Sequence, residues 1–379
     1  MKNIVRNLTI LSCVGSSAFA APFLAIGDNA ELFATGEASV AYNDNILLAS
    51  GVPGSPELED TIFTFVPGFD LQFGKDSLIK GNLIGTATLT SYADNDNLNN
   101  QLLAIGGNST YDNGSLKLGA NASFKELDQP TVDVVPNGKL VERHVADVGV
   151  NGELAFSEKI SAGAGIAYSH VDYKDPAYTE EESYTVPVNI YYELTPKVDV
   201  SAGIRYTNTE LDNGAEYDAY YYNVGARGSF TPKLSGSFSV GYNTRSVNIG
   251  PDDDDSIGAD ASLAYAYSDK TQFTLAASRN FSNATAGGAS YENSEITIGA
   301  SSAITVDWRL NAALTYRMLD YQNVSRTDDY VQASVGATYL INTHLSTSLT
   351  YIFRDNSSDA GAANEFSNNV VSLSISARY

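Results

Sequence analysis

Alternation of apolar and polar residues over strand-length stretches constrains this chain more than any other feature. In residues 371–379, one face carries Val, Leu, Ile, Ala and Tyr, and the other carries three Ser and Arg. A β-strand places successive side chains on opposite faces. The same two-residue period recurs in residues 198–207, 234–243 and 308–318, without the 3.6-residue period of a helix. The pattern therefore predicts an all-β protein.

Short polar turns separate the predicted strands at a regular spacing. The interval between turns is nearly constant, with one longer step between Asn113 and Glu158, and the turns are centred at Asp76, Asn113, Glu158, Pro196, Pro232, Asp269, Val306 and Thr343. Each interval accommodates two strands and one long, polar connection, which indicates a repeated hairpin. Adding one strand at residues 31–43 and one after the last long connection predicts about 18 strands, or 16 if one hairpin is misassigned.

Two kinds of β-structure fit this pattern, a soluble propeller or sandwich and a barrel that crosses a membrane. A soluble sheet turns its polar face to water and needs a second sheet to cover its apolar face. Tyrosines near strand ends instead suit the aromatic girdles of a membrane barrel. Such tyrosines are Tyr42, Tyr92, Tyr168, Tyr206, Tyr242, Tyr316, Tyr351 and Tyr379. The predicted fold is a transmembrane antiparallel β-barrel of about 18 strands, with short periplasmic turns and long extracellular loops.

Residues 1–20 have the three parts of a secretory signal peptide. Lys2 and Arg6 precede an apolar stretch at residues 8–14, and small residues end at Ala18-Phe19-Ala20. A buried N-terminal helix is the alternative, but no amphipathic period or cap supports it. We expect cleavage after Ala20, a short periplasmic segment at residues 21–30, and a barrel at residues 31–379. The only cysteine, Cys13, lies in the leader, so the exported part has no thiol, which suits the periplasm and the bacterial outer membrane.

The charge of the chain excludes one class of partner. Of its 22 Lys and Arg, two lie in the predicted leader, whereas all 45 Asp and Glu lie beyond it, so the exported chain carries a net charge of about −25. A surface this acidic is unsuited to nucleic acid, whose phosphates attract basic residues.

Residues capable of catalysis or metal binding are sparse. The three histidines, His144, His170 and His344, are predicted at different levels of the wall, an arrangement unsuited to zinc. Ser169 precedes His170, but neighbours in a strand point to opposite faces, so they cannot act as a nucleophile and its base. The acidic run at residues 252–255 lacks the spaced ligands and the glycine of a calcium loop, and it favours a solvated loop over a calcium site. We predict no enzyme, no cofactor and no metal.

Charged residues on the predicted inner face are the candidate functional residues. By the alternation they are Arg205, Arg227, Arg245, Arg309, Arg317, Arg354 and Arg378, with Asp147, Glu153, Glu193 and Asp199. The arginines lie in the C-terminal half and the acids earlier, so an asymmetric, solute-selecting lumen is one interpretation. The other is that these residues only solvate the lumen and pair across strands. Tyr191 and Tyr221 also face inward and are candidates for stacking on sugar rings.

A barrel of this size has a lumen wider than side chains alone fill, so a water-filled passage is expected unless a loop folds in. The long connections at residues 46–59 and 127–139 are the candidates for such a constriction. Passage of polar solutes is the leading hypothesis. A structural or adhesive surface protein with a closed lumen is the alternative.

A short motif near the N-terminus resembles the opening of the putative β-barrel porin 2 family. The residues that carry the resemblance are Tyr42-Asn43-Asp44-Asn45-Ile46, Asp60-Thr61-Ile62 and Pro67-Gly68-Phe69-Asp70-Leu71. The resemblance implies a porin-like outer-membrane conduit, and a secreted exopolysaccharide as a candidate cargo, with no catalytic residues. The expected partners are outer-membrane lipid and lipopolysaccharide, the barrel-assembly machinery through residues 371–379, and a polysaccharide.

Overall fold

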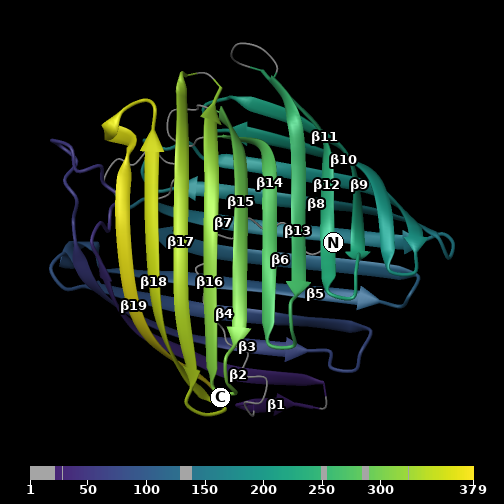
Figure 1. The fold of residues 1–379 in the computed structure, drawn as a ribbon, viewed down its shortest axis with the longest axis horizontal. Coiled ribbons are helices and arrows are strands. Elements are labelled where there is room, and N and C mark those ends of the chain that lie inside the picture. The colour runs from purple at the N-terminus through teal and green to yellow at the C-terminus, as the bar shows by residue number, and fades with distance from the viewer. Residues whose placement is uncertain (1–21, 28, 129–138, 249–253, 284–289, 323) are drawn as a thin grey trace.

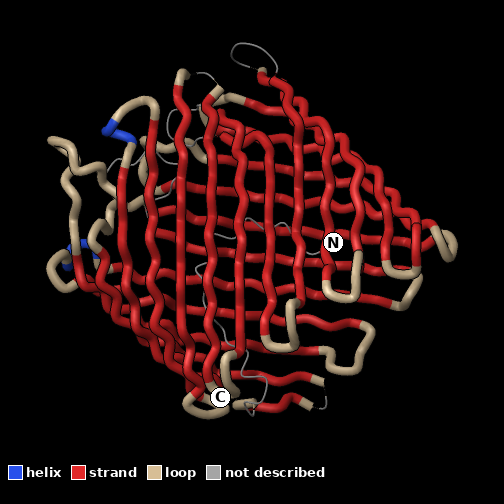
Figure 2. The backbone as a smooth tube through the Cα atoms, in the orientation of Figure 1, coloured by secondary structure: helices blue, strands red, loops and turns tan. Residues whose placement is uncertain are grey.

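A computed structural model describes residues 22–27, 29–128, 139–248, 254–283, 290–322 and 324–379 (Figure 1). The predicted signal peptide, residues 1–20, lies outside the described residues, and its cleavage stays a prediction. In the described part of the chain, the regular structure is nearly all β (Figure 2). Among the same residues, no helix has both the length and the apolar character needed to cross a membrane.

Eighteen long strands follow one short strand at the N-terminus. The strands are β1 (Leu24–Ile26), β2 (Ala30–Asn43), β3 (Asp60–Phe73), β4 (Ile79–Tyr92), β5 (Asn100–Asp112), β6 (Leu116–Asp128), β7 (Glu142–Ala155), β8 (Ile160–Tyr173), β9 (Glu181–Thr195), β10 (Val198–Leu211), β11 (Glu216–Ser229), β12 (Leu234–Val247), β13 (Asp254–Ala266), β14 (Thr271–Asn283), β15 (Ser290–Ala303), β16 (Trp308–Tyr321), β17 (Arg326–Leu340), β18 (Leu345–Ser358) and β19 (Phe366–Arg378). Two single-turn 3-10 helices, η1 (Asp96–Leu98) and η2 (Ala362–Asn364), lie in connections.

Strands β2 to β19 form a closed antiparallel barrel. Each strand pairs with the next along the chain, and β19 pairs with β2 to close the ring. Beyond the end of β19, the backbone N–H and carbonyl of Tyr379 still bond to Ala34 of β2, at 2.9 and 2.7 Å. Strands of the near wall cross those of the far wall steeply, as the tilt of a closed barrel requires (Figure 1). The predicted barrel and its count of 18 strands are confirmed. The segment at residues 21–30 contains β1, which pairs with the first residues of β2.

Six of the eight short connections share one local hydrogen-bonding pattern. A Ser, Thr or Asn at the start of the turn accepts backbone N–H groups two and three residues ahead with its side-chain oxygen. The residues that do so are Asn113, Ser157, Thr231, Ser268, Thr305 and Asn342. These turns lie at one end of the barrel, called here the turn end, and the long connections lie at the other, the loop end.

The two faces of the wall differ in chemistry. On β12, Phe238, Val240 and Tyr242 point outward with nearly half of each side chain exposed, while the alternate residues Asn243 and Arg245 point inward and are buried. Apolar side chains exposed on the outside suit a hydrocarbon environment, since an aqueous one would disfavour them. Most of the buried apolar residues instead collect inside the loop end.

Candidate functional site

The inner wall of the barrel is where the predicted functional residues lie. The strand registers place all eleven of them on the inward-facing phase: Asp147, Glu153, Glu193, Asp199, Arg205, Arg227, Arg245, Arg309, Arg317, Arg354 and Arg378. They do not form one cluster. They occupy different levels and different sides of the lumen.

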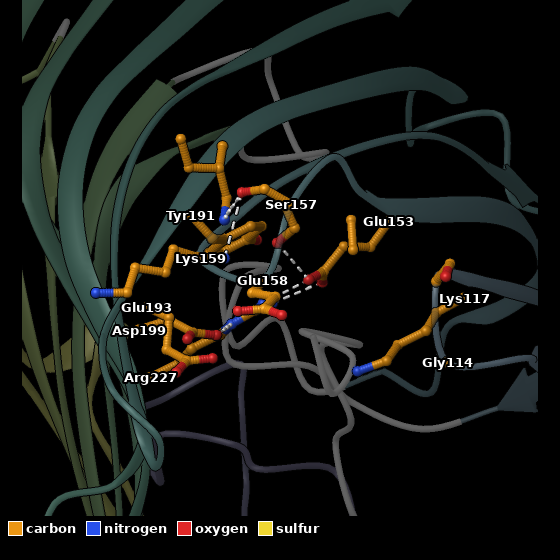
Figure 3. A pocket seen from close by; sticks show the side chains of 14 residues that line it. Gly114, Lys117, Glu153, Ser157, Glu158, Lys159, Tyr191, Glu193, Asp199 and Arg227 are labelled. Atoms are coloured by element: carbon orange, nitrogen blue, oxygen red, sulfur yellow. Dashed lines mark hydrogen bonds and ion pairs between the residues drawn. The ribbon is translucent and has the colours of Figure 1, made fainter.

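Arg227 forms the most extensive ion pair of the wall, near the turn end (Figure 3). From β11, its Nη1 and Nη2 donate to both oxygens of Glu153 on β7, at 2.8 and 2.6 Å, and its Nε donates to Asp199 on β10 at 2.9 Å. The guanidinium lies 3.5 Å above the ring centroid of Tyr191 on β9. Arg227 thus spans five neighbouring strands, and the bidentate geometry is the strong form of this interaction.

A cavity of about 160 Å³ lies beside this bridge. Residues of β6 to β11 and the turn at residues 156–159 line it, and among them are Lys117, Lys159 and Glu193 (Figure 3). The Oγ of Ser161 also donates to Glu153, at 2.8 Å. The side of the lumen formed by β6–β11 therefore carries charges of both signs, most of them tied to one another.

Two further arginines resemble Arg227 in their contacts. In each, the guanidinium lies over an aromatic ring and bonds a carboxylate beyond it. Arg205 on β10 passes over Tyr221 on β11 and donates to Asp260 on β13 at 3.1 Å. Arg378 on β19 passes over Phe33 on β2 and donates to Asp70 on β3 at 2.8 Å. The ring offers its negative face to the cation, so each bridge combines a cation–π contact with an ion pair.

These bridges change the role of the two inward tyrosines. Tyr191 and Tyr221 are 5% and 4% exposed, and each has one ring face under an arginine. Neither ring presents an open face to a sugar, because the arginine already occupies it.

The remaining predicted arginines have other surroundings. Arg245, 3% exposed, donates from Nη2 to Asp254 and Ser290 at 2.6 and 2.7 Å. Arg317 donates to Asn293 at 2.7 Å, with Glu295 at 4.0 Å. Arg354 donates to amide oxygens, at 3.3 Å to Gln332 and 3.0 Å to Asn368.

The predicted acids also differ from one another. Asp147 accepts from the hydroxyls of Ser123 and Ser169, at 3.2 and 2.8 Å. Glu193 lies opposite Asp199 in the register and lines the cavity beside Arg227.

Three acids that complete the bridges were not predicted from the sequence: Asp70, Asp254 and Asp260. Each lies in a strand with inward phase, so the alternation alone places it in the lumen. The sequence does not show which arginine each acid bonds, because that depends on which strands lie close together in the closed barrel.

At the loop end, the first long connection enters the barrel. Leu48, 5% exposed, packs against Tyr330 of β17 and Phe366 of β19, both on the inward phase. The Asn45 side chain holds this fold, because it bonds both backbone polar groups of Ala49 at 2.8 Å. The first part of the candidate constriction at residues 46–59 therefore packs on inward-facing residues at the loop end, and its effect on the width of the lumen stays a prediction. Most of the other candidate, residues 127–139, lies outside the described residues.

The family-like motif at residues 42–46 closes the seam of the barrel. The Asn368 side chain, fully buried on β19, donates to Asn43 Oδ1 at 2.6 Å and to the Asn45 carbonyl at 3.2 Å. Asp44 accepts from the backbone and the side chain of Asn369, at 2.6 and 2.7 Å. The motif thus anchors the inserted loop to the last strand.

Outward-facing tyrosines form a band below the loop end. The phenol of Tyr316 donates to Asp329 of the next strand at 2.5 Å. In the same way, Tyr206 donates to Asp218 at 2.5 Å, and Tyr351 donates to Asn369 at 2.7 Å. Tyr42 bonds Glu59 at 2.5 Å, Tyr242 bonds Asp255, and Tyr168 stacks with His170. Each of these tyrosines has a residue directly opposite it on the neighbouring strand. The residue that accepts the phenol hydrogen bond lies two positions from that opposite residue, toward the loop end.

Two tyrosines of the predicted girdle lie apart from this band. Tyr379 is exposed at the turn end. Tyr92 is 9% exposed and belongs to the inward phase of β4, opposite Ile62, so its assignment to a girdle was wrong. Tyr92 lies at the end of β4, three residues after the outward-facing Leu89, so the alternation along the strand points it inward.

The histidines stay apart. His144 faces outward between Glu126 and Asp172, at 3.9 and 3.5 Å, and the His344 ring contacts the Arg378 carbonyl in a turn. Ser169 points into the barrel toward Asp147, whereas His170 points outward. Of the acidic run, Asp252 and Asp253 lie outside the described residues. Within the described ranges, no group of three or more His, Cys, Asp and Glu is placed to hold a metal ion.

The loop end is crowded with negative charge. In the connection between β8 and β9, the pKa of the Glu180 carboxyl is raised, first by loss of hydration and then by the nearby carboxylates of Asp212 and Asp172.

A closed ring of strands with an apolar exterior and a charged interior defines a membrane-spanning β-barrel. The family model described as "Putative beta-barrel porin 2" matches residues 215–379, which run from just before β11 to the end of the chain. The resemblance inferred from residues 42–71 is thereby confirmed, although the match falls on other strands. No curated protein matches the chain.

Solved structures of porins have a similar overall architecture. OccK3 (OpdO) of Pseudomonas aeruginosa is 10% identical with a TM-score of 0.47, covering 92% of this chain and 96% of its own. OccAB4 of Acinetobacter baumannii is 11% identical with a TM-score of 0.47, covering 93% and 99%. OpdL of Pseudomonas aeruginosa is 12% identical with a TM-score of 0.47, covering 93% and 99%. At these identities and scores, the likeness does not extend to individual residues.

Proposed function

We propose that this protein is an outer-membrane channel through which polar solutes pass. The observation that carries the proposal is the wall itself, which is apolar toward the outside and lined with charged, amide and hydroxyl side chains toward the inside. A wall of 18 strands encloses more space than side chains alone fill. An enzyme has less support, because Ser169 points into the barrel and His170 points outward, so this neighbouring pair cannot act together.

The chemistry of the two ends supports one orientation. We place the turn end in the periplasm and the acidic loop end outside the cell, as is usual for such barrels. The tyrosine band then lies at the outer lipid boundary, next to lipopolysaccharide. Strand β19 would engage the barrel-assembly machinery.

Graded permeation into vesicles tests the proposal. Liposomes containing the purified protein are placed in isotonic glucose, maltose or maltotriose, and swelling is followed by light scattering. The proposal expects swelling above that of protein-free vesicles, with rates that fall as the sugar grows. Absence of swelling even in glucose would overturn it.

A secreted polysaccharide is the finer form of this proposal, drawn from the family resemblance. It requires that a chain of several sugar units enter the lumen past the inserted loop. Swelling that persists with oligosaccharides of six or more units would support it, and a sharp size limit below three units would exclude it.

A surface protein with a closed lumen is the second candidate. The packing of Leu48 against Tyr330 and Phe366 favours it, because this contact fills part of the loop end. Removal of residues 50–57 separates the two functions. A faster solute flux in the shortened variant supports the channel, whereas lost attachment of cells with unchanged flux supports the surface protein.

A further inference from the structure

Arg309 differs from the other arginines at the turn end of the lumen. It is the second residue of β16 and lies between Ala303 of β15 and Thr338 of β17 in the register. Both neighbours are small, so the guanidinium stands in a depression of the wall. Among the described residues, no carboxylate lies within ion-pair distance of it.

The contrast with the bridged arginines is direct. Arg227 and Arg378, at the same end of the barrel, each bond a carboxylate at 2.9 Å or less. Their positive charge is neutralised by the wall itself. Arg309 keeps its charge available to a solute, because a guanidinium is protonated at every physiological pH.

A cavity of about 160 Å³ surrounds Arg309. Its polar lining consists of hydroxyl and amide groups together with one carboxylate on the turn, and the residues that provide them are Ser301, Thr305, Asp307, Asn311 and Thr338. The hydroxyl and amide groups both donate and accept hydrogen bonds, whereas Asp307 only accepts them. The set suits a ligand that carries one anionic group and several hydroxyls.

The opposite side of the lumen carries acids at a comparable level. Strand β16 lies nine strands from β7 in either direction around the ring of 18, so Arg309 and Glu153 belong to opposing walls. Glu153, Asp199 and Glu193 all lie on that far side, around Arg227. Because Arg227 bonds Glu153 and Asp199 there, the far wall carries paired charges of both signs, whereas Arg309 has no bonded carboxylate among the described residues.

We propose that Arg309 and the cavity around it bind the carboxylate end of a sugar acid on its way through the channel. This inference rests on the proposed function and names the class of solute that the turn end selects. Arg309 forms a bidentate bond with the carboxylate. Asp307 and the hydroxyl groups of the cavity form hydrogen bonds with the sugar hydroxyls. A neutral sugar of the same size binds more weakly, because it lacks the carboxylate that Arg309 bonds.

Fluorescence of Trp308 tests binding without depending on transport. Trp308 is the only tryptophan of the chain and lines the same cavity. The full-length protein in detergent micelles is titrated with sodium D-glucuronate, with D-glucose as the neutral probe and sodium chloride to match ionic strength. We expect a saturable change with glucuronate that glucose and chloride do not reproduce.

Matched variants locate the site. Arg309→Gln should weaken glucuronate binding about tenfold, the equivalent of one lost charge-assisted interaction. Arg309→Lys should recover part of the affinity, because it keeps the charge and loses the planar fork. Lys270→Gln removes a positive charge from the neighbouring turn, outside the cavity, and should leave binding unchanged.

Two results would overturn the inference. One is an equal response to glucuronate and glucose, and the other is unaltered glucuronate binding in Arg309→Gln that still shows the heat-modified gel mobility of a folded barrel. Neither result touches the proposed function, which fails only if folded protein lets no solute through.

Discussion

The guanidinium of Arg227 on β11 holds the carboxylate of Glu153 on β7 with two hydrogen bonds, at 2.8 and 2.6 Å, across three intervening strands. Residues that are 74 positions apart in the chain thereby tie a quarter of the barrel wall together. Both side chains are mostly buried, at 21% and 15% exposure. The pair is therefore a structural element of the lumen and not a mobile surface ion pair.

Removal of one partner of this pair should cost more than removal of both. Arg227→Gln removes the cation that bonds both Glu153 and Asp199, and we expect a loss of about 2–3 kcal/mol in unfolding free energy, somewhat below the loss for a fully buried pair. The double variant Arg227→Gln with Glu153→Gln should recover part of this loss. Urea unfolding in lipid vesicles, followed by Trp308 fluorescence, measures the coupling. Strictly additive effects would show that the bridge does not stabilise the wall.

Leu48 should control the width of the loop end. Leu48→Ala removes the contact with Tyr330 and Phe366, so we expect the part of the loop beyond the Asn45 anchor to move away from the wall. A truncation at a buried leucine costs about 2–5 kcal/mol, which here acts on the loop and not on the strands. We expect a higher single-channel conductance with more frequent current fluctuations. Pro53→Ala, in an exposed part of the same loop, serves as the control and should behave as the wild type. If both variants keep the wild-type conductance, the loop does not narrow the lumen.

The phenol of Tyr316 should contribute a small, specific stabilisation. Tyr316→Phe keeps the ring in the lipid boundary and removes only the hydrogen bond to Asp329. The expected loss is about 0.5–1.5 kcal/mol, the net value of one hydrogen bond. Tyr265→Phe, an outward tyrosine near the turn end, is the matched control and should show no loss. Equal stabilities of the two variants in vesicle unfolding would contradict a structural role for the phenol–carboxylate pairs.

Local features of the chain predicted the fold because the determinants of this fold are local. The phase of alternation in β12 and β19 indicates which side chains meet lipid, and the turns form through oxygens such as those of Ser157 and Thr231. Tyr92 was assigned to the outer face because it lies near a strand end. Its direction depends instead on the alternation along β4, which turns it inward.

The pairing of the inward charges was not predictable in this way. Arg378 bonds Asp70, 308 residues away, and the partner depends on the closure of the ring and on the register across β2. A shift of one residue in a single strand exchanges its inner and outer faces. The inward fold of Leu48 was equally hidden, since its partners Tyr330 and Phe366 come from the far end of the chain.

Ion conductance through the purified protein tests the central claim most directly. The protein is inserted into planar bilayers in potassium chloride, and the current is recorded with the wild type and with the variant that lacks residues 50–57. The account predicts discrete, ohmic current steps for the wild type and larger steps for the shortened variant. Insertion of folded barrel without any conductance in either protein would contradict it.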